Sequence, residues 1–338
     1  MTMRTPLCTS ALLFLAAVVL SSNSASAEVA VLSEKKNGEP EVHVPRIAGQ
    51  WLHIFNPNDK HKKPEGDWYT NDHSIVQTKD GRWHAYGIIG YRPANPWKGE
   101  DKLFHASADR LASLNWKEHD YALIANKTYE RVLWAPYIFK ENGILHMFYN
   151  VGNMQKNAPT YASWGKLCMA TSAEDDGFNW KRHELNPLFS DPGHARDSFV
   201  MKEGGQYYFY YTKTVNEVDL RSAVAVRTGP DPEHWSGSRN VHIQPLKCDW
   251  GGDCESPTVI KYEGVFYLFI TLAMTGYDKT HVYWSKDPLR FPRENFVTEL
   301  ETHAPEIVRD GTKWYITNTG WGRNGLYLAP LEWKRRQR

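Results

Sequence analysis

One pattern of apolar and polar positions recurs five times along the chain. Each copy has a polar or aromatic first residue, a short apolar stretch, a turn that contains glycine, and an aromatic-rich second stretch. The first residues are Asp72, Trp134, Asp197, Glu255 and His303, whose numbers differ by 62, 63, 58 and 48 on subtraction. A glycine turn between two β-prone stretches predicts a β-hairpin in each copy.

A third apolar stretch, and then a loop with an aromatic residue, follow each hairpin. Up to four short strands in each of five copies are typical of a β-propeller. No long segment has the 3.6-residue periodicity of a helix, and a β-sandwich would not explain the five copies. We therefore predict an all-β fold, a five-bladed β-propeller with four-stranded antiparallel blades around a central pocket.

Both ends of the chain bear on the domain boundaries. Arg4, the apolar run 11–20 and Ala25-Ser26-Ala27 are typical of a signal peptide, and the run is too short to span a membrane. We expect cleavage before Glu28, and hence a secreted or periplasmic protein. The fifth copy lacks an outer strand, which the stretch 47–55 can supply to close the ring. We assign residues 1–27 to the signal peptide, 28–45 to an N-terminal extension and 46–338 to the propeller.

Composition narrows the class of partner. Lys and Arg number 40 and Asp and Glu 39, giving a net charge of +1, whereas a nucleic-acid-binding face is strongly basic. The 14 Trp and 18 Tyr suit β-structure and also provide flat surfaces for sugar rings. We expect an oligosaccharide or polysaccharide partner, and neither nucleic acid nor a membrane.

Three cysteines remain after the predicted cleavage. In an oxidising compartment Cys248 and Cys254 can form a disulfide, but the odd number of cysteines leaves this pairing open. Cys168 lies in an apolar stretch and is expected to be a buried thiol. No CxxC or HExxH spacing occurs, which disfavours a zinc site.

The five first residues are expected to surround one pocket, because the innermost strand of each propeller blade lines the central channel. Three of them, Asp72, Asp197 and Glu255, are carboxylic acids, which cost repulsion and desolvation unless function uses them. Glycoside hydrolysis needs a protonated carboxylic acid for the leaving oxygen, and a carboxylate that activates water or attacks the anomeric carbon. A third acid raises the pKa of the general acid. We predict these three as the catalytic residues, at one shared position of the repeat.

Four further residues are expected near the acids. Arg196 can keep Asp197 ionised, and Asn71 can orient a substrate hydroxyl group. Trp134 is either a platform for a sugar ring or a core residue. His303 either holds a water molecule or a metal ion in the pocket, or is a hydrogen-bonded structural residue.

The ordered set resembles the five-bladed arabinanase, levansucrase and invertase superfamily of glycoside hydrolases, best known from families 43 and 32. There the first blade offers an aspartate, the third an Arg-Asp pair and the fourth a glutamate, as Asp72, Arg196-Asp197 and Glu255 do here. The resemblance implies that Glu255 is the general acid. It implies that Asp72 is the general base or the nucleophile, and that Asp197 tunes the pKa of the acid or steadies the transition state.

Other motifs share in the resemblance. Trp134-Ala135-Pro136 is similar to the second-blade motif common in family 43. His303 is similar to a fifth-blade histidine that lies near a bound calcium in some members, which implies a Ca²⁺ in the central channel, although the acid–base reaction itself requires no cofactor. Gly320-Trp321-Gly322 resembles a bacterial branch related to family 43 and to β-fructosidases, and we add Trp321 to the expected substrate-binding residues. His73 departs from the pattern, because family 43 usually has proline there.

We therefore predict a secreted glycoside hydrolase that acts on furanosyl or pentosyl sugars containing arabinose, xylose or fructose. One alternative is an exo-hydrolase like the family 117 anhydro-galactosidases, in which His73 or His303 would take the part of the acid. A second is a carbohydrate-binding propeller without catalysis. A sialidase is disfavoured, because one loose Asp-box, 172–180, and Arg196 alone are too few of its features.

Overall fold

A computed structural model describes residues 40–60, 67–94, 99–114, 116–152, 164–191 and 195–336. The predicted signal peptide, 1–27, and residues 28–39 of the predicted extension lie outside the described residues. Within the described ranges, no helix has the length and apolar character needed to cross a membrane.

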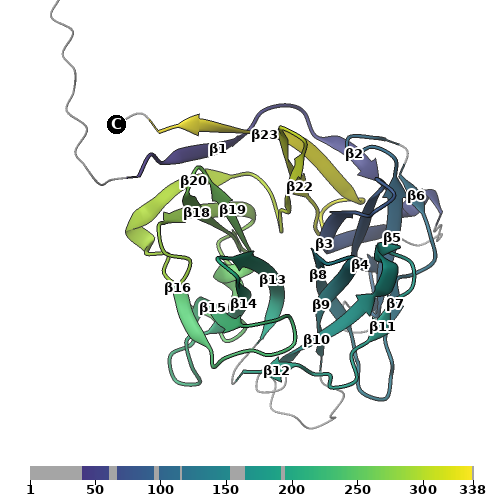
Figure 1. The fold of residues 1–338 in the computed structure, drawn as a ribbon, viewed down its shortest axis with the longest axis horizontal. Helices are drawn as coiled ribbons and strands as arrows, with labels where there is room; N and C mark the ends of the chain where they lie inside the picture. Colours follow the sequence, from purple (N-terminus) through teal and green to yellow (C-terminus); the bar gives the residue numbers. More distant parts are fainter. Residues whose placement is uncertain are drawn as a thin grey trace, which may run out of the picture. The chain divides into compact units, whose positions relative to one another are not determined.

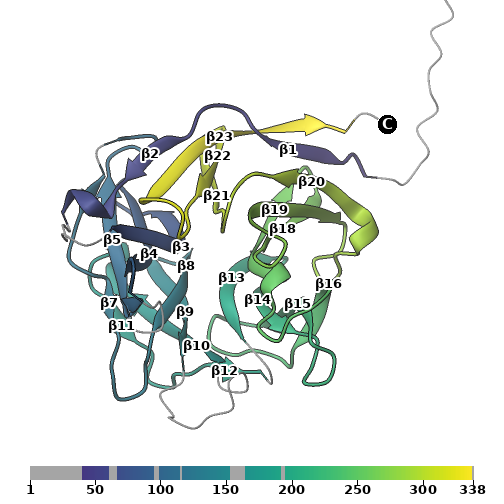
Figure 2. The ribbon, with the colours of Figure 1, turned by 180° about the vertical axis from the view of Figure 1, so that it is seen from behind.

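Five antiparallel sheets stand around a common centre, as Figure 1 shows, and as Figure 2 shows from behind. The predicted five-bladed β-propeller is thereby confirmed. In each blade the strand order runs outward from the channel, so the first strand of each repeat is the innermost one.

The first three blades follow one another along the chain. Blade 1 contains β3 (Trp68–Gln77), β4 (Trp83–Tyr91), β5 (Lys102–Ala108), β6 (Lys117–Glu118) and β7 (Leu123–Ile124). Blade 2 contains β8 (Leu133–Glu141), β9 (Ile144–Gly152), β10 (Trp164–Ser172), β11 (Lys181–Arg182) and β12 (Phe189–Ser190). Blade 3 contains β13 (Arg196–Glu203), β14 (Gln206–Thr214), β15 (Arg221–Gly229) and β16 (Arg239–Lys247).

The last two blades complete the ring. Blade 4 contains β17 (Glu255–Tyr262), β18 (Val265–Leu272), β19 (Gly276–Ser285) and β20 (Phe296–Leu300). Blade 5 contains β21 (Ile307–Asp310), β22 (Lys313–Asn318), β23 (Leu326–Arg335), β1 (His43–Ile47) and β2 (Leu52–Phe55). Four short 3₁₀ turns join strands at η1 (Pro57–Asp59), η2 (Ala173–Asp175), η3 (Gly252–Cys254) and η4 (Arg293–Asn295).

Blade 5 closes the ring with residues from both parts of the chain. β1 and β2 both pair with β23, with His43 opposite Arg335 and Leu52 opposite Leu328. This confirms that the stretch 47–55 contributes to the missing outer strand, but blade 5 begins earlier, because β1 starts at His43, inside the residues 28–45 assigned to the extension. Because the closing strands are hydrogen-bonded to the last strand of the chain, the ring cannot open without breaking a sheet.

The second strands of blades 1 to 4 are buried at most positions, because each lies inside a blade that is covered by its neighbours, whereas β22 of blade 5 is buried only over its second half. β18, for example, is buried at all eight positions, and a strand covered on both faces reads as a continuous apolar run. Aromatic pairs fill the space between blades: the rings of Phe55 and Phe104 lie 4.9 Å apart, and those of Tyr137 and Phe199 lie 4.5 Å apart. The blades therefore hold the starts of the inner strands in fixed positions.

A β-bulge stands near the start of four inner strands. In β3, β8, β13 and β17 two residues of the inner strand lie opposite a single residue of the second strand. These bulge residues are 71–72, 135–136, 197–198 and 256–257. Three bulges open with a residue of positive φ, namely Ala135 (45°), Asp197 (57°) and Ser256 (48°), and Ala304 (45°) has the same conformation just before β21. Such bulges bend a strand and redirect its side chains.

The bulges correct one prediction from the sequence. Aligned on the bulge, Glu255 directly precedes it, as Trp134 does in blade 2, whereas Asp197 is its first residue and Asp72 its second. The three acids therefore do not share one position of the repeat. The extra bulge residue shifts the register in a way that a comparison of apolar stretches does not reveal.

All three cysteines in the described residues, Cys168, Cys248 and Cys254, are buried and unbonded. Cys248 accepts a hydrogen bond from the main chain of Gly252 at 3.4 Å. Burial raises the pKa of the Cys168 thiol to about 12, which agrees with the expected inert, buried thiol.

Candidate active site

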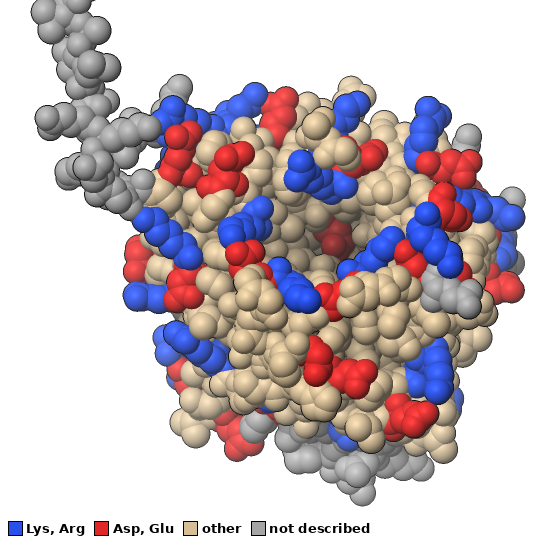
Figure 3. All heavy atoms as spheres, in the orientation of Figure 1, with Lys and Arg blue, Asp and Glu red and all other residues tan. Residues whose placement is uncertain are grey.

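The three acids lie in or next to the β-bulges of three inner strands. Glu255 stands before the bulge of β17, Asp197 within that of β13, and Asp72 at the second bulge residue of β3. Seen along the axis in Figure 3, the centre of the ring is hollowed and acidic side chains are visible inside it.

Arg196 joins two of the acids. Its guanidinium contacts Glu255 Oε1 at 2.6 Å through Nη2 and Asp197 Oδ2 at 3.2 Å through Nε. Nη1 donates to the carbonyl oxygen of Trp250, whose ring lies 5.4 Å from Arg196 Cζ. Arg196 is 5% exposed, so one buried positive charge is shared by two carboxyl groups. The expected pairing with Asp197 is present, and the pairing with Glu255 was not expected.

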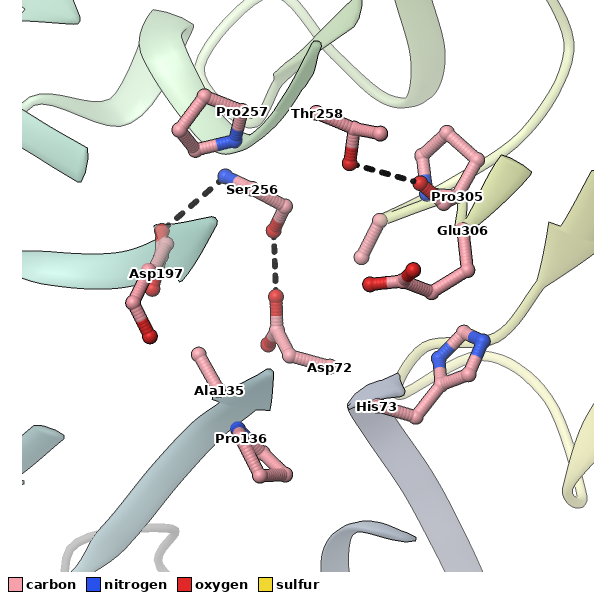
Figure 4. Close-up of a pocket in the computed structure, with 12 residues that line it drawn as sticks. Asp72, His73, Ala135, Pro136, Asp197, Ser256, Pro257, Thr258, Pro305 and Glu306 are labelled. Carbon is pink, nitrogen blue, oxygen red and sulfur yellow. Dashed lines mark hydrogen bonds between the residues drawn. The ribbon is translucent and has the colours of Figure 1, made fainter. Parts of the chain in front are cut away.

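Ser256 joins the third acid to the other two. Its main-chain N–H donates to Asp197 Oδ2 at 3.2 Å, and its hydroxyl group donates to Asp72 Oδ1 (Figure 4). The positive φ of Ser256 directs both groups of one residue toward two different carboxylates. Arg196 and Ser256 therefore connect Asp72, Asp197 and Glu255 into one hydrogen-bonded group.

Burial and mutual repulsion set the charges of this group. Burial raises the pKa of Glu255 to about 8; Arg196 opposes this rise, and Asp197 and Asp72 add to it. Burial also raises the pKa of Asp197 to about 6, again against the effect of Arg196 and with that of Asp72. Since one guanidinium cannot compensate two buried carboxylates, Glu255 keeps its proton at neutral pH.

Asp72 and Asp197, but not Glu255, also line a small cavity in the channel. Its other lining residues include His73, Thr258 and Glu306, and its volume of about 20 Å³ is enough for a bound water. In Figure 4 the Glu306 carboxyl group points into this space toward Asp72. Burial, and then the charge of Asp72, raise the pKa of Glu306 well above its usual range, which favours the protonated form.

His303 and Asn71 lie together on the blade 5 side. His303 Nε2 lies 3.1 Å from Asn71 Oδ1, and its Nδ1 lies 2.7 Å from the carbonyl oxygen of Tyr277. The ring also stacks on Tyr277 at 3.8 Å. Burial lowers the pKa of His303. These contacts agree with the second role expected of His303, that of a hydrogen-bonded structural residue.

His73 lies deeper, beside blade 5. Its Nε2 lies 2.8 Å from the hydroxyl group of Thr317, and it is 3% exposed. Burial, followed by the neighbouring His303, lowers the pKa of His73 to about 3. His73 is therefore neutral at physiological pH and contributes to the lining of the small cavity.

A wall that the sequence analysis missed stands beside Asp72. Glu100 is 3% exposed, and the Tyr69 hydroxyl group donates to it at 2.7 Å. Burial raises the pKa of Glu100 to about 7. The Tyr69 ring in turn lies 6.3 Å from that of Trp321, which is 46% exposed. Glu100 lies in the loop after β4, where no repeat pattern marks it.

The described residues give little support to a metal ion at His303. Both of its ring nitrogens already lie within hydrogen-bonding distance of Asn71 and Tyr277. Across the part of the chain that the structure describes, no group of three or more His, Cys, Asp and Glu could hold a metal ion. Ca²⁺ prefers six to eight oxygen ligands, whereas the carboxyl groups that line the small cavity are those of Asp72, Asp197 and Glu306.

Fold and site together define a five-bladed propeller with a buried carboxylate triad at its axis, the arrangement of the superfamily that the motifs resemble. No family model matches the chain. It is 25% identical over 150 residues to a probable arabinan endo-1,5-α-L-arabinosidase A of Aspergillus fumigatus, covering 43% of each chain. A protein of the same description from Aspergillus clavatus is 23% identical over 274 residues, covering 76% of this chain and 77% of that protein.

Solved structures agree in fold. A thermostable family-43 glycoside hydrolase superposes with a TM-score of 0.59 at 16% identity, covering 82% of this chain and 96% of that one. A family 43 β-xylosidase/α-arabinofuranosidase from a compost metagenome gives 0.58 at 17%, covering 86% and 95%. A family 117 glycoside hydrolase of Zobellia galactanivorans gives 0.58 at 13%, covering 86% and 90%. The predicted resemblance to this superfamily is confirmed.

Proposed function

We propose that this protein is an exported glycoside hydrolase that cleaves the glycosidic bonds of arabinose- or xylose-containing oligosaccharides and polysaccharides. The substrate class is supported by the sequence relatives, which are described as arabinan-cleaving, and by the β-xylosidase/α-arabinofuranosidase among the structural neighbours. Export is supported by the signal-peptide pattern in residues 1–27.

The observation that carries the proposal is the single hydrogen-bonded group of three carboxyl groups. Arg196 links Asp197 to Glu255, and Ser256 links Asp197 to Asp72. The pKa of Glu255, raised to about 8 mainly by burial, gives the site the protonated acid that the reaction requires.

In the reaction that we propose, Glu255 donates its proton to the leaving glycosidic oxygen as the bond to the anomeric carbon breaks. Asp72 either removes a proton from the attacking water or attacks the anomeric carbon itself, and in the second case Glu255 then activates the water that releases the sugar. Asp197, held by Arg196 and Ser256, keeps the pKa of Glu255 high and adds negative charge near the oxocarbenium-like transition state.

The alternatives have weaker support. In the family 117-like hypothesis a histidine would donate the proton. The pKa of His73 is lowered to about 3, chiefly by burial, and burial also lowers that of His303, so both are neutral at physiological pH. In the hypothesis of a binding propeller, a carboxyl group with a pKa matched to proton donation would have no task.

No step of the proposed reaction passes through a metal ion. Each proton is moved by a carboxyl group of the chain. A Ca²⁺ bound in the channel would stabilise the inner strands without taking part in the reaction. If the proposal is right, dialysis against EDTA leaves the rate per folded molecule unchanged, whereas a lost rate that added Ca²⁺ restores would contradict it.

A substrate screen tests the proposed function. Purified protein is incubated with arabinan, arabinoxylan, levan, inulin and agar oligosaccharides, and the products are followed by ¹H NMR. We expect release of arabinose or xylose units, and the anomer formed first distinguishes a base from a nucleophile at Asp72. Absence of hydrolysis of all five substrates, or full activity in Glu255→Gln, would overturn the proposal.

A further inference from the structure

A second hollow lies beside the central pocket, between blades 4 and 5. It is lined by the turn between β22 and β23, by the start of β19 and by the segment between β1 and β2. Its volume is about 600 Å³. This volume lies within the range of ligand-binding sites, 300–1,000 Å³. All of its lining residues belong to the described part of the chain.

Trp321 stands in the turn that separates this hollow from the central pocket. The next three residues of the turn, 322–324, line the hollow, whereas the Trp321 ring lies 6.3 Å from that of Tyr69, whose hydroxyl group donates to Glu100. Asn318 also connects the two sites, because it lines the hollow and its Oδ1 accepts a hydrogen bond from the His303 main chain at 3.0 Å. The hollow therefore adjoins the blade 5 side of the central pocket.

The turn is held from both sides. Arg92 donates to the carbonyl oxygen of Trp321 and, at 2.7 Å, to Asn324 Oδ1. Arg323 pairs with Asp278 at 3.3 Å across the hollow, and the main-chain N–H of Trp321 donates to the Tyr277 hydroxyl group at 3.2 Å. These contacts preorganise the surface, which lowers the entropic cost of binding a ligand there.

The chemistry of the lining suits a neutral ligand rich in hydroxyl groups. Its charged side chains are two acids, Asp278 and Glu301, and two bases, Lys279 and Arg323, so the formal charges cancel. Arg323 leaves its Nε–H without a hydrogen-bond partner among the described residues, and its guanidinium and the Asp278 carboxylate offer paired donors and acceptors.

Aromatic rings supply the apolar part of the lining. Trp51 and Tyr327 are half-buried and both line the hollow. Tyr327 is fixed by stacking on His53 at 4.3 Å with the planes 10° apart. Rigid rings beside polar groups are what a sugar needs, because its C–H faces pack on aromatic surfaces while its hydroxyl groups bond at the edges.

We propose that the hollow between blades 4 and 5 is a distal subsite, which holds the sugar units of the chain whose glycosidic bond lies at the central carboxylates. The inference rests on the proposed function for the identity of the sugar. It adds to that function a place where chain length is recognised, outside the catalytic pocket.

Substrates of increasing length test the subsite. The rate constant kcat/KM is measured for 4-nitrophenyl α-L-arabinofuranoside and for linear α-1,5-arabino-oligosaccharides of two to eight units, and in parallel for the xylose analogues. Arg323→Ala and Asp278→Asn are expected to lower kcat/KM for the longest chains about tenfold, mainly through KM, and to leave the nitrophenyl substrate within about twofold. Glu118→Gln, in a separate surface hollow between β2 and β6, is the matched control.

Binding separates this inference from the proposed function. In a Glu255→Gln background, the Kd of the hexasaccharide is measured by calorimetry with and without the Arg323 or Asp278 substitution. If a chain binds more tightly than a monosaccharide and the substitutions remove that advantage, the subsite stands, even where hydrolysis is absent. If the substitutions weaken all lengths equally, or if neither hexasaccharide binds more tightly than its monosaccharide, the inference is overturned even where hydrolysis is confirmed.

Discussion

Blades 2 and 5 place Ala135 and Ala304 in the same left-handed conformation in which blades 3 and 4 place Asp197 and Ser256. For a residue other than glycine this conformation costs about 1–2 kcal/mol. The two alanines have no polar side chain to use the conformation, whereas Asp197 and Ser256 use it to connect the acids. The conformation is therefore a recurring backbone feature near the start of these inner strands. The chemistry depends on which side chain occupies the position.

This comparison shows what a strained backbone indicates here. A positive φ at Asp197 alone would suggest strain that is maintained for function. The same φ at Ala135 shows that the bulge recurs in a blade that contributes no acid. The functional difference between the two pairs of blades then rests on the side chains of Arg196, Asp197, Glu255 and Ser256.

The largest expected effect comes from the proton of Glu255. Glu255→Gln keeps the shape of the side chain and removes the proton donor, so kcat on arabino-oligosaccharides should fall about 10²–10⁴-fold. The loss should be smaller for 4-nitrophenyl glycosides, because their leaving group needs no proton. Glu306→Gln is the control, since the protonated form of Glu306, in the same channel, resembles glutamine, and it should stay within about threefold. Equal losses in the two variants would contradict the assignment of the acid.

The second effect concerns stability. Arg196→Met leaves Asp197 and Glu255 without their shared cation in a buried site, and should lower the free energy of unfolding by about 3–5 kcal/mol. Arg221→Met breaks an exposed pair with Asp219 at 2.6 Å and should leave the free energy of unfolding nearly unchanged. Urea unfolding followed by tryptophan fluorescence measures both variants. Similar losses of unfolding free energy in the two variants would mean that the buried acids depend on their cation no more than the exposed ion pair of blade 3 does.

Much of this contrast between blades could be predicted from the sequence, because it rests on local patterns. The hairpin of each repeat is set by its own apolar stretches and glycine turn, so the number of blades and the closing strand followed directly. Asp72, Asp197 and Glu255 stood out because three of the five first residues of the repeats are carboxylic acids. Their exact register did not follow, since the inserted bulge residue leaves the apolar alternation downstream unchanged.

Residues that act through tertiary contacts could not be found in this way. Ser256 bonds to Asp72 across 184 positions of sequence, and nothing around it predicts that partner. Glu100 and Tyr277 lie in or beside connections between strands, where a single polar residue is common. For Arg196 the sequence indicated its neighbour Asp197, whereas the contact with Glu255 depends on how blades 3 and 4 meet.

The third prediction concerns pH. The pKa of Glu255 is raised to about 8, first by burial, and only its protonated form can donate. The rate constant kcat/KM should therefore be lost as the pH rises through about 8, falling tenfold for each further unit. In Glu255→Gln this alkaline limb should disappear from the residual activity on nitrophenyl substrates. A limb that persists unchanged in this variant would assign the titration to another group.

A smaller effect follows from making blade 4 like blade 5. Ser256→Ala gives blade 4 the alanine that blades 2 and 5 already carry, so the backbone should be retained and the melting temperature should change little. Asp72 would lose the hydroxyl donor, a charge-assisted bond that contributes about 1.5–3 kcal/mol. We expect kcat/KM to fall about 10- to 100-fold with KM nearly constant. Ser256→Thr, which keeps the hydroxyl group, should recover part of the rate, and failure of both variants to lose activity would remove Ser256 from the site.

The smallest effect tests the alanines themselves. Ala135→Gly relieves the cost of a positive φ, about 1–2 kcal/mol, but glycine gains about 0.5–1 kcal/mol of conformational freedom in the unfolded chain. The unfolding free energy should therefore stay equal or rise by up to about 1 kcal/mol, with activity unchanged. Ala85→Gly, at a fully buried position in β4 outside the positive-φ residues, has no strain to relieve and should lower stability by about 1 kcal/mol or more. If both variants lost the same amount, the left-handed conformation at Ala135 would carry no strain, and blades 2 and 5 would hold it at no cost.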